Sequence, residues 1–414
     1  MFDIDKIRQD FPMLQGKTNE GKPLIYLDNG ATTLKPQCVI EAVSNYYQNI
    51  TSNINRGDYQ LANIVDKAYE EVRQTVSEFI NCQSREIVFT SGTTHALNQI
   101  AFGYGLKYLK EDDEILISLA EHASNTLPWY RVAEKTGCKV RFIPLDETGK
   151  ITVDNVKKML SEKVKIVSIA HATNVLGHIS DVKEISKVVH QVGGIVVVDG
   201  AQSVPHIKTD VQDLDCDFLA FSGHKICGPT ASGVLYGKYH LLEKMEPLMS
   251  GGGMNARFDI DFNVLLKKAP YKFEAGTPNI EAALGLKAAI QYVEKIGLDN
   301  IVKYVKQLRD YAIEEMKKLD NIIIYNQKAD TGIISFNVVD NGQILFGQDV
   351  SAYLSKHGLC LRSGNHCAKN LWQHLKTDST VRCALYFYNT KNEVDKLIEV
   401  LKNTTLKNCI DVIL

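Results

Sequence analysis

Residues 195–225, IVVVDGAQSVPHIKTDVQDLDCDFLAFSGHK, decide the fold class and hold the strongest chemical signal. The apolar run Ile195–Asp199 predicts a strand buried on both faces, as strands of parallel sheets are. A second strand is predicted at Asp217–Phe221, and Lys225 follows it closely. In open α/β sheets, ligands bind at the carboxyl ends of strands. We therefore expect Asp199 and Lys225 to lie at a common site.

Short apolar runs alternate with helical patterns on both sides of this stretch. Further strands are predicted at Glu86–Thr90, Glu114–Ser118, Val140–Ile143, Val164–Ala170 and Gly233–Tyr236, and a helix at Val182–Val192. Strands that alternate with helices predict a mainly parallel sheet covered by helices on both faces, which is an α/β fold.

After Gly285 the pattern is typical of a smaller α+β unit. It predicts one long or broken helix over about residues 285–320, then a strand (Gly332–Val338), a helix (Gln348–His357), a strand (Leu359–Arg362) and a helix (Asn392–Lys402). We therefore predict a large domain over residues 20–290 and a small C-terminal domain over residues 291–414. The N-terminal segment, residues 1–19, begins with a predicted helix and is expected to pack on the small domain.

Composition excludes several classes of protein. The 414 residues carry 47 Lys and Arg against 49 Asp and Glu, so no basic field points to nucleic acid or an anionic membrane. Apolar runs stay well below the roughly 18 residues of a membrane span. The start, MFDIDKIRQD, lacks the apolar core of a signal peptide. We expect a cytoplasmic protein.

The nine cysteines are scattered and form no CxxC pair, so we expect reduced thiols and no metal site. We interpret four of them as inert packing residues: Cys38, Cys82, Cys138 and Cys216. Cys360 and Cys383 lie in strand-like patterns and are interpreted in the same way.

Asp199 and Lys225 together suit pyridoxal phosphate. A lysine that follows a buried strand is partly desolvated, which lowers its pKa and frees the amine for Schiff-base chemistry. An acid at a neighbouring strand end can hold the pyridinium nitrogen of the cofactor. Taken singly, Asp199 could be a turn or helix cap and Lys225 a solvated charge, but their combination favours the cofactor.

A phosphate cradle is predicted at Ser91–Ala101, SGTTHALNQIA, which follows a strand and opens a helix. Thr93 and Thr94 supply hydroxyls where backbone N–H groups and the helix dipole favour an anion. Simple helix capping by threonine explains this segment alone equally well. Ser222 and His224 could add donors to the same phosphate.

Two further residues stand at expected strand ends or loops. His122 follows a strand and could stack on a planar cofactor, although a lone histidine is more often a structural hydrogen-bonding residue. Cys367 lies in the loop RSGNHCA, where Arg362 and His366 could favour its thiolate. Packing as a small buried side chain is the usual alternative for a cysteine.

Seven motifs occur in an informative order: YLDNGATT, AEHASN, HATNVLG, VVVDGAQS, FSGHKICGP, FEAGTPN and RSGNHCA. From Tyr26 to Leu397 the chain resembles the fold-type I, class V pyridoxal-phosphate enzymes. Within these it is most similar to cysteine desulfurases of the SufS type (group II), whose relatives include selenocysteine lyases. The resemblance implies conversion of L-cysteine to L-alanine, with a persulfide on Cys367. A SufE-like or SufU-like acceptor protein would take the sulfur for iron–sulfur cluster assembly.

The resemblance also implies roles for individual residues. Lys225 would hold the cofactor covalently, Asp199 would pair with its pyridine nitrogen and Gln202 with its phenolic oxygen. Thr277 would reach the phosphate of the other subunit of a homodimer. The implied cofactor-binding set is Thr93, Thr94, His122, Asn174, Asp199, Gln202, Ser222, His224, Lys225 and Thr277. The implied catalytic residues are Lys225, Cys367 and His122, and the implied substrate-binding residues are Asn174, Arg362 and Arg382.

Four positions depart from the family pattern. Asn55 and Asn365 stand where histidine is common, Gly30 where alanine is usual, and Asn370 where proline is common. These differences affect the surroundings of Cys367 and the choice of sulfur acceptor. Two alternatives stay open: a selenocysteine lyase or another class V enzyme, and a non-catalytic pyridoxal-phosphate-binding module.

Overall fold

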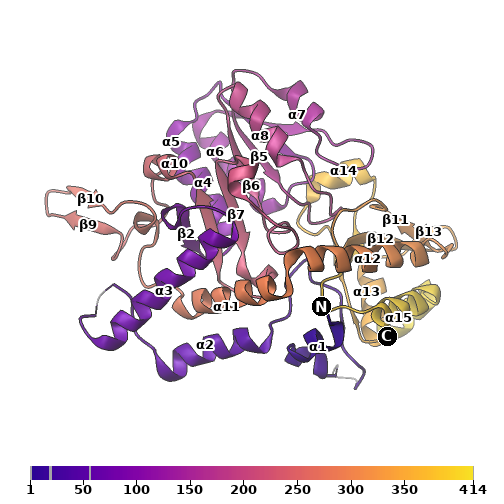
Figure 1. Cartoon of the computed structure of the whole chain (residues 1–414). Helices are drawn as coiled ribbons and strands as arrows, with labels where there is room; N and C mark the ends of the chain where they lie inside the picture. Colours follow the sequence, from indigo (N-terminus) through magenta and orange to yellow (C-terminus); the bar gives the residue numbers. More distant parts are fainter. Residues whose placement is uncertain (1, 18–20, 56, 414) are drawn as a thin grey trace.

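The computed structural model describes residues 2–17, 21–55 and 57–413 and contains a seven-stranded sheet at its centre (Figure 1). The strands are β2 (Ile87–Thr90), β3 (Glu114–Ser118), β4 (Lys139–Ile143), β5 (Val164–Ala170), β6 (Ile195–Asp199), β7 (Phe218–Ser222) and β8 (Gly233–Gly237). Their order is β2-β8-β7-β6-β5-β3-β4, and β8 runs antiparallel to the other six strands, which are parallel to one another. The predicted α/β fold with a mainly parallel sheet is confirmed.

Helices cover both faces of this sheet. One face packs against α4 (Thr93–Ile100), α6 (Leu127–Thr136) and α10 (Tyr239–Lys244), and the other against α3 (Gln60–Phe79), α8 (Val182–Gln191) and α11 (Ile280–Ile296). Strand β6 shows why its sequence is apolar throughout. Val196 and Val198 belong to the core on one face, and Val197 belongs to the core on the other.

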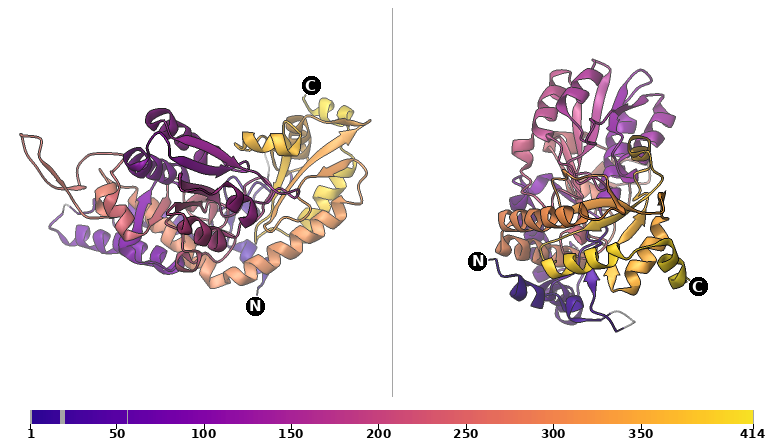
Figure 2. Two further views of the ribbon diagram at one scale, coloured as in Figure 1. Left: turned by 90° about the horizontal axis from the view of Figure 1, so that it is seen from above. Right: turned by 90° about the vertical axis from the view of Figure 1, so that its right-hand side faces the viewer.

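A second, antiparallel sheet lies toward the C-terminus. Its strands are β11 (Ile322–Ile324), β12 (Ile333–Asp340), β16 (Thr380–Ala384) and β15 (Arg362–Gly364), in that order, with β13 (Gln343–Ile344) paired to β12. It packs with α12 (Leu298–Met316), α13 (Gly347–Lys356), α15 (Lys391–Lys402) and α16 (Leu406–Ile413). Figure 2 shows this sheet and its helices to one side of the large sheet.

Two details differ from the expected elements, and a third decides between two that the sequence allowed. The predicted strand Leu359–Arg362 is divided, because β14 (Leu359–Cys360) pairs with β1 (Ile25–Tyr26) while β15 starts at Arg362. Of the predicted long or broken helix, the broken form is present, because Gly297, with φ of +88°, ends α11 before α12 begins. Helix α16 follows the last helix that the sequence predicts.

The N-terminal helix α1 (Ile4–Gln9) contacts the C-terminal part of the chain. Arg8 forms an ion pair with Glu393 at the start of α15, with 2.9 Å between Nη1 and Oε1. The Phe11 ring packs on Tyr388, with 4.6 Å between ring centroids. These contacts place the start of the chain against the segment that leads into α15.

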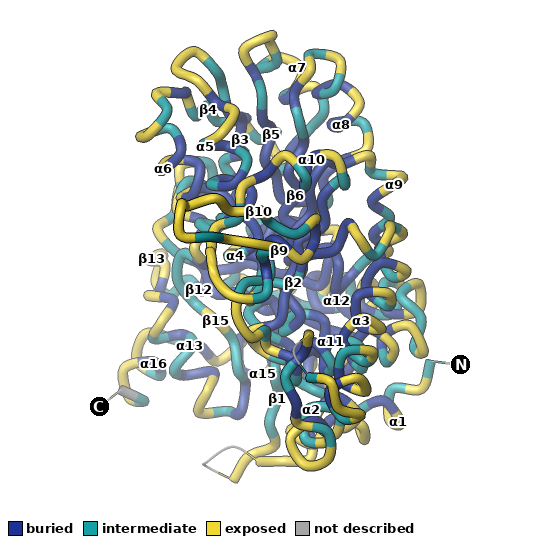
Figure 3. Tube along the Cα trace, turned by 90° about the vertical axis from the view of Figure 1, so that its left-hand side faces the viewer, coloured by how far each residue is buried: buried dark blue, intermediate teal, exposed yellow. Residues whose placement is uncertain are grey.

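A hairpin of β9 (Asn255–Phe258) and β10 (Val264–Leu266) stands away from the body of the molecule (Figures 1 and 2) and is largely exposed (Figure 3). The remaining helices are α2 (Gln37–Asn49), α5 (Leu106–Tyr108), α7 (Val153–Met159), α9 (Val211–Leu214) and α14 (Trp372–Leu375). Across the described residues, every helix is too short or too polar to span a bilayer.

Candidate active site

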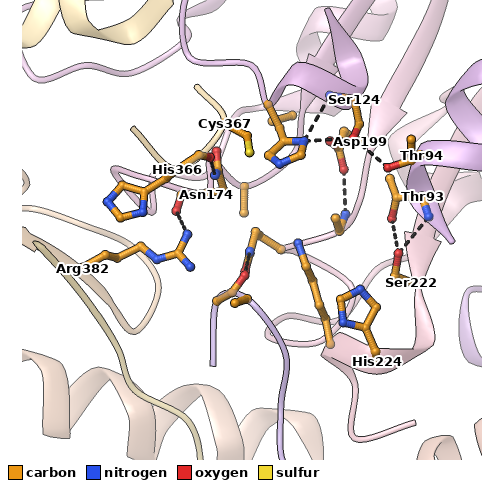
Figure 4. Close-up of a pocket in the computed structure, with 18 of the residues that line it drawn as sticks. Thr93, Thr94, Ser124, Asn174, Asp199, Ser222, His224, His366, Cys367 and Arg382 are labelled. Carbon is orange, nitrogen blue, oxygen red and sulfur yellow. Dashed lines mark hydrogen bonds between the residues drawn. The ribbon is translucent and has the colours of Figure 1, made fainter. Parts of the chain in front are cut away.

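A cavity of about 190 Å³ lies at the carboxyl ends of β5, β6 and β7, where the parallel strands end (Figure 4). It gathers twelve of the predicted residues: Thr93, Thr94, His122, Asn174, Asp199, Gln202, Ser222, His224, Lys225, Arg362, Cys367 and Arg382. Thr277 lies elsewhere, in a hollow of about 310 Å³ that Ser91 and His95 also line. Its hydroxyl accepts a hydrogen bond from Asn53 Nδ2 at 3.2 Å.

Lys225 and Asp199 reach the cavity from neighbouring strands. Asp199 is the last residue of β6, is 5% exposed, and accepts a hydrogen bond from the Ala201 N–H at 2.9 Å. Lys225 ends the short 3₁₀ turn after β7. Burial lowers the pKa of Lys225 to about 8, while the Asp199 carboxylate opposes this shift. A larger share of this amine is therefore neutral at physiological pH than of a solvated lysine.

Hydroxyl groups form a cradle at one end of the cavity. The Thr93 N–H, at the start of α4, donates to Ser222 Oγ at 2.8 Å, and the two hydroxyl oxygens are also 2.8 Å apart. Thr94 Oγ1 lies 2.7 Å from Ser124 Oγ. Gly92, with φ of +147°, makes the turn, and a Cβ there would lie 3.2 Å from Ser222 Oγ. The cradle thus joins a helix N-terminus to several hydroxyls, which suits a phosphate.

The two histidines beside the cradle are neutral. Burial lowers the pKa of His224 to about 4, with a smaller contribution from the charge of Lys225. Burial also lowers the pKa of His122. His122 Nδ1 accepts a hydrogen bond from the Ser124 N–H at 3.1 Å, so the ring proton is assigned to Nε2. A neutral ring fixed in this way can stack on a flat group.

Figure 4 shows Arg382, Asn174, His366 and Cys367 at the end of the cavity opposite Ser222 and His224. Arg382, in the middle of β16, is buried, and its Nη1 donates to the Asn174 carbonyl oxygen at 2.9 Å. Asn174 Nδ2 donates in turn to the His366 carbonyl oxygen at 2.8 Å. This end of the cavity therefore presents a guanidinium, the group that binds carboxylates best.

Cys367 is exposed and lies in a sharply bent loop. His366 and Cys367 both adopt left-handed backbone conformations, with φ of +48° and +56°. The Cys367 carbonyl oxygen accepts a hydrogen bond from the Ala123 N–H at 2.7 Å, and its N–H donates to Asn365 Oδ1 at 3.1 Å. Such backbone strain persists only where surrounding contacts enforce it. The loop therefore holds the thiol at the cavity mouth.

The structure corrects the interpretation of His366 as a cation and of Cys38 as a packing residue. Burial lowers the pKa of His366 to about 3, and its Nε2 contacts the Thr380 hydroxyl at 3.0 Å, so this ring supplies no positive charge to the thiol. Cys38 does not serve as a packing residue, because it is exposed. In the described part of the chain, Cys38 and Cys367 are the exposed cysteines, and the other seven are buried or half-buried.

The residues present fit pyridoxal phosphate. Within the described residues, four buried polar atoms of residues that line the cavity have no hydrogen-bond partner: Asn174 Oδ1, Gln202 Oε1, His366 Nδ1 and Arg382 Nε. Buried polar atoms are nearly always paired, so these four suit polar groups bound among them. The buried Asp199 carboxylate, the Lys225 amine with its lowered pKa and the hydroxyl cradle match the ring nitrogen, the aldehyde and the phosphate of that cofactor.

Sequence reasoning missed two residues of the site. Ser124 lines the cavity and fixes both His122 and Thr94, and its signal was its place in the motif AEHASN. Asp28 contacts both Arg362 and Arg382, at 3.3 and 3.2 Å, and lies in the motif YLDNGATT. Asp28 follows no predicted strand, and Ser124 lies two residues after His122, which was the residue given a role after that strand.

The comparisons with known proteins agree with this geometry. The Aminotransferase class-V family model matches residues 25–397. A relative from Halalkalibacterium halodurans, described as a probable cysteine desulfurase, is 45% identical over 404 residues, which cover 96% of this chain and 97% of the relative.

Two solved structures share the fold throughout. The cysteine desulfurase CsdA of Escherichia coli, in an S-sulfonic acid form, matches with a TM-score of 0.90 and 34% identity, over 97% of this chain and 98% of its own. The apo cysteine desulfurase of Thermococcus onnurineus NA1 matches with a TM-score of 0.90 and 38% identity, over 96% and 97%.

Proposed function

The chain belongs to the Aminotransferase class-V family and is a pyridoxal-phosphate-dependent cysteine desulfurase, and we propose that it stores the sulfur of L-cysteine on Cys367 and passes it to an acceptor protein. One observation carries this proposal. The Cys367 thiol and the Lys225 amine line the same cavity, and the buried Arg382 lines it as well.

Pyridoxal phosphate, when bound, supplies an electron sink for the substrate carbon next to the amine. Asp199 would hold the ring nitrogen, and the Thr93 and Ser222 hydroxyls would hold the phosphate, as would those of Thr94 and Ser124. His122, neutral and fixed by Ser124, would lie on the ring. Gln202 Nε2 donates to the Gly30 carbonyl oxygen at 2.7 Å, which leaves its oxygen for the bound group.

Lys225 would both bind the cofactor and carry a proton. Its pKa of about 8 is well below that of a solvated lysine, so the neutral amine is readily available. The neutral Nζ can take the Cα proton of the substrate and return a proton when alanine forms. A general base is most effective when its pKa is near the working pH.

Arg382 would bind the substrate carboxylate, with Arg362 and Asn174 beside it. Arg382 lies at the end of the cavity opposite the phosphate cradle (Figure 4). This arrangement orients cysteine with its carboxylate at one end and its amine toward Lys225. The side chain that bears the sulfur is then free to point at Cys367.

Cys367 would accept the sulfur. Its Sγ bonds to the substrate sulfur while the bond between Cβ and sulfur breaks. Cysteine and the enzyme thiol become alanine and an enzyme persulfide, so no external oxidant or reductant is required. Because Cys367 is exposed, a second protein can reach this persulfide, and we propose a sulfur acceptor that serves iron–sulfur cluster assembly.

We further propose a homodimer, in which Thr277 contributes to the cofactor site of the neighbouring subunit. Thr277 does not line the 190 Å³ cavity of its own subunit, and Asn53 is the hydrogen-bond partner of its hydroxyl within the described chain. Residues 20–290 and 291–414 remain the proposed domains, with Lys225 and Asp199 on the first and Cys367 and Arg382 on the second.

The test combines product analysis with mass mapping. Protein loaded with cofactor and treated with L-cysteine is expected to release alanine and to gain one sulfur atom on the peptide that holds Cys367. The matched control is Cys38→Ser, which removes the other exposed thiol and is expected to change neither result. Alanine release without sulfur on the Cys367 peptide would contradict the proposal. Activity confined to selenocysteine would favour a selenocysteine lyase.

A further inference from the structure

Two arginines face each other across the strands that form one wall of the cavity. In the antiparallel pair of β15 and β16, Arg362 stands directly opposite Arg382. Like charges in such a pair repel each other. Arg382 is almost fully buried, with 3% of its side chain exposed, whereas half of the Arg362 side chain is exposed. A negatively charged group is therefore needed to offset the repulsion between these two guanidinium groups.

Asp28 lies where it can do this. One of its carboxylate oxygens is 3.2 Å from Arg382 Nη2, and the other is 3.3 Å from Arg362 Nε. Asp28 itself does not line the cavity, whereas both arginines do. The carboxylate therefore sits behind the pair. It neutralises one of their two positive charges and leaves one charge for an anion in the cavity.

The position of Asp28 does not depend on the arginines. Its backbone forms a parallel bridge with Ala384, two residues beyond Arg382 on the same strand. The Ala384 N–H donates to the Leu27 carbonyl oxygen at 2.7 Å, and Asn29 Nδ2 donates to the Ala384 carbonyl oxygen at 2.6 Å. Asp28 is thus fixed to the strand whose arginine it contacts.

The next turn of the same segment fits closely against Arg382. A Cβ on Gly30 would lie 3.0 Å from Arg382 Cζ, so the guanidinium packs on the bare backbone of this glycine. Asp28 and Gly30 therefore confine Arg382 from two sides. The buried Arg382 Nε has no partner among the described residues and remains available to a ligand.

We propose that Asp28 is a positioning residue that couples Arg362 and Arg382 into a two-guanidinium clamp for the substrate carboxylate. This inference rests on the proposed function, because it takes the carboxylate of cysteine as the ligand. Asp28 does not touch the substrate. Its contribution is to hold both arginines in place and to leave one net positive charge between them.

The experiment compares two ligands of holoenzyme that differ only in the carboxylate. In a Cys367→Ser background, which prevents sulfur transfer, dissociation constants for L-cysteine and for cysteamine are measured from the visible spectrum of the bound cofactor. Asp28→Asn is expected to weaken cysteine binding about tenfold, the size of one lost charge-assisted hydrogen bond, and to leave cysteamine within about twofold. With Cys367 intact, KM for cysteine should rise by a similar factor while kcat changes little.

The matched control is Glu114→Gln, which removes another paired carboxylate, 2.5 Å from Arg141 Nη1 and at the amino-terminal end of β3, whereas the cavity lies at the carboxyl ends of the strands. It is expected to leave the ratio of the two dissociation constants unchanged. Asp28→Glu keeps the charge and should stay within about threefold of wild type, so it tests the same contact if the asparagine variant folds poorly.

The outcomes separate the two proposals. If Asp28→Asn weakens cysteine and cysteamine equally, or tightens cysteine, the clamp is overturned. The same holds if Asp28→Glu loses as much cysteine affinity as Asp28→Asn. If the wild-type enzyme releases no alanine from cysteine, the proposed function itself fails, whatever the variants do.

Discussion

Removal of the buried Arg73 is expected to destabilise the protein strongly, and the structure gives the size of the effect. Arg73 is 1% exposed, and its two terminal nitrogens donate to the Glu274 carboxylate at 2.8 and 2.9 Å. Nη1 also donates to the Ile87 carbonyl oxygen at 2.8 Å, and the guanidinium lies 4.5 Å from the Phe89 ring centroid. Arg73→Met keeps the side chain long but leaves the Glu274 charge buried without its partner.

Breaking a buried ion pair in this way costs about 3–5 kcal/mol. At about 2.1 cal/mol/K per residue, unfolding of 414 residues carries an entropy of about 0.9 kcal/mol/K. The expected fall in Tm is therefore about 3–6 °C, measured by differential scanning calorimetry. Glu274 also accepts the Phe89 N–H at 2.9 Å, so Glu274→Gln keeps that bond and should restore part of the Tm in the double variant.

Arg131→Met is the matched control. Arg131 pairs with Glu134 at 3.5 Å on the surface, with 65% and 72% of the two side chains exposed. Exposed pairs contribute about 0–1 kcal/mol, so this variant should shift Tm by about 1 °C at most. Equal shifts for the two methionine variants, or no recovery in the double variant, would refute the reasoning.

Three other predictions address the site directly. Cys367→Ser should still bind pyridoxal phosphate and change its spectrum with cysteine, but release almost no alanine, because a hydroxyl is a far weaker nucleophile than a thiolate; full release would disprove the thiol's role. Capture of pyridoxal phosphate by the apoprotein should speed up as pH rises through about 8, because the neutral Lys225 amine is the reactive form. Asp199→Asn should move this midpoint to lower pH, since it removes the negative charge that raises the pKa of Lys225. A midpoint near the ordinary 10.5 for the wild-type protein would contradict the lowered pKa of Lys225. Light scattering should give about twice the 46.3 kDa chain mass, and Thr277→Ala should weaken cofactor retention several-fold; a loaded, active monomer would rule out the shared site.

The central strands were predictable because burial on both faces leaves little freedom of sequence. Strands β3, β5 and β6 have the predicted bounds, and each is an apolar run that contacts cores on both sides of the sheet. Asp199 and Lys225 could be assigned to one site for a related reason. The carboxyl ends of adjacent parallel strands meet at one edge, so sequence order translates directly into proximity.

The features that the sequence did not predict depend on contacts between distant segments or on burial, which no local sequence pattern encodes. Asp28 lies 354 positions from Arg382, and only the pairing of its segment with the end of β16 brings them together. The division of the strand at Leu359 depends on β1, which is two residues long. The neutral state of His366 depends on burial, which the sequence RSGNHCA does not reveal.

Because the nine cysteines differ in exposure, thiol labelling can measure the fraction of subunits that carry a persulfide on Cys367. Burial raises the pKa of Cys227 and Cys383 to about 12 and also raises that of Cys216, so alkylating reagents meet little thiolate there. In a Cys38→Ser chain, Cys367 is the only exposed thiol in the described residues. A brief maleimide pulse then labels Cys367 in both states. Label on a persulfide is attached through an S–S bond and is released by a reductant, whereas label on the free thiol is retained. The released and retained fractions therefore count the loaded and the empty subunits. The exposure of Cys367 thus allows persulfide formation, and transfer of its sulfur to an acceptor, to be followed quantitatively.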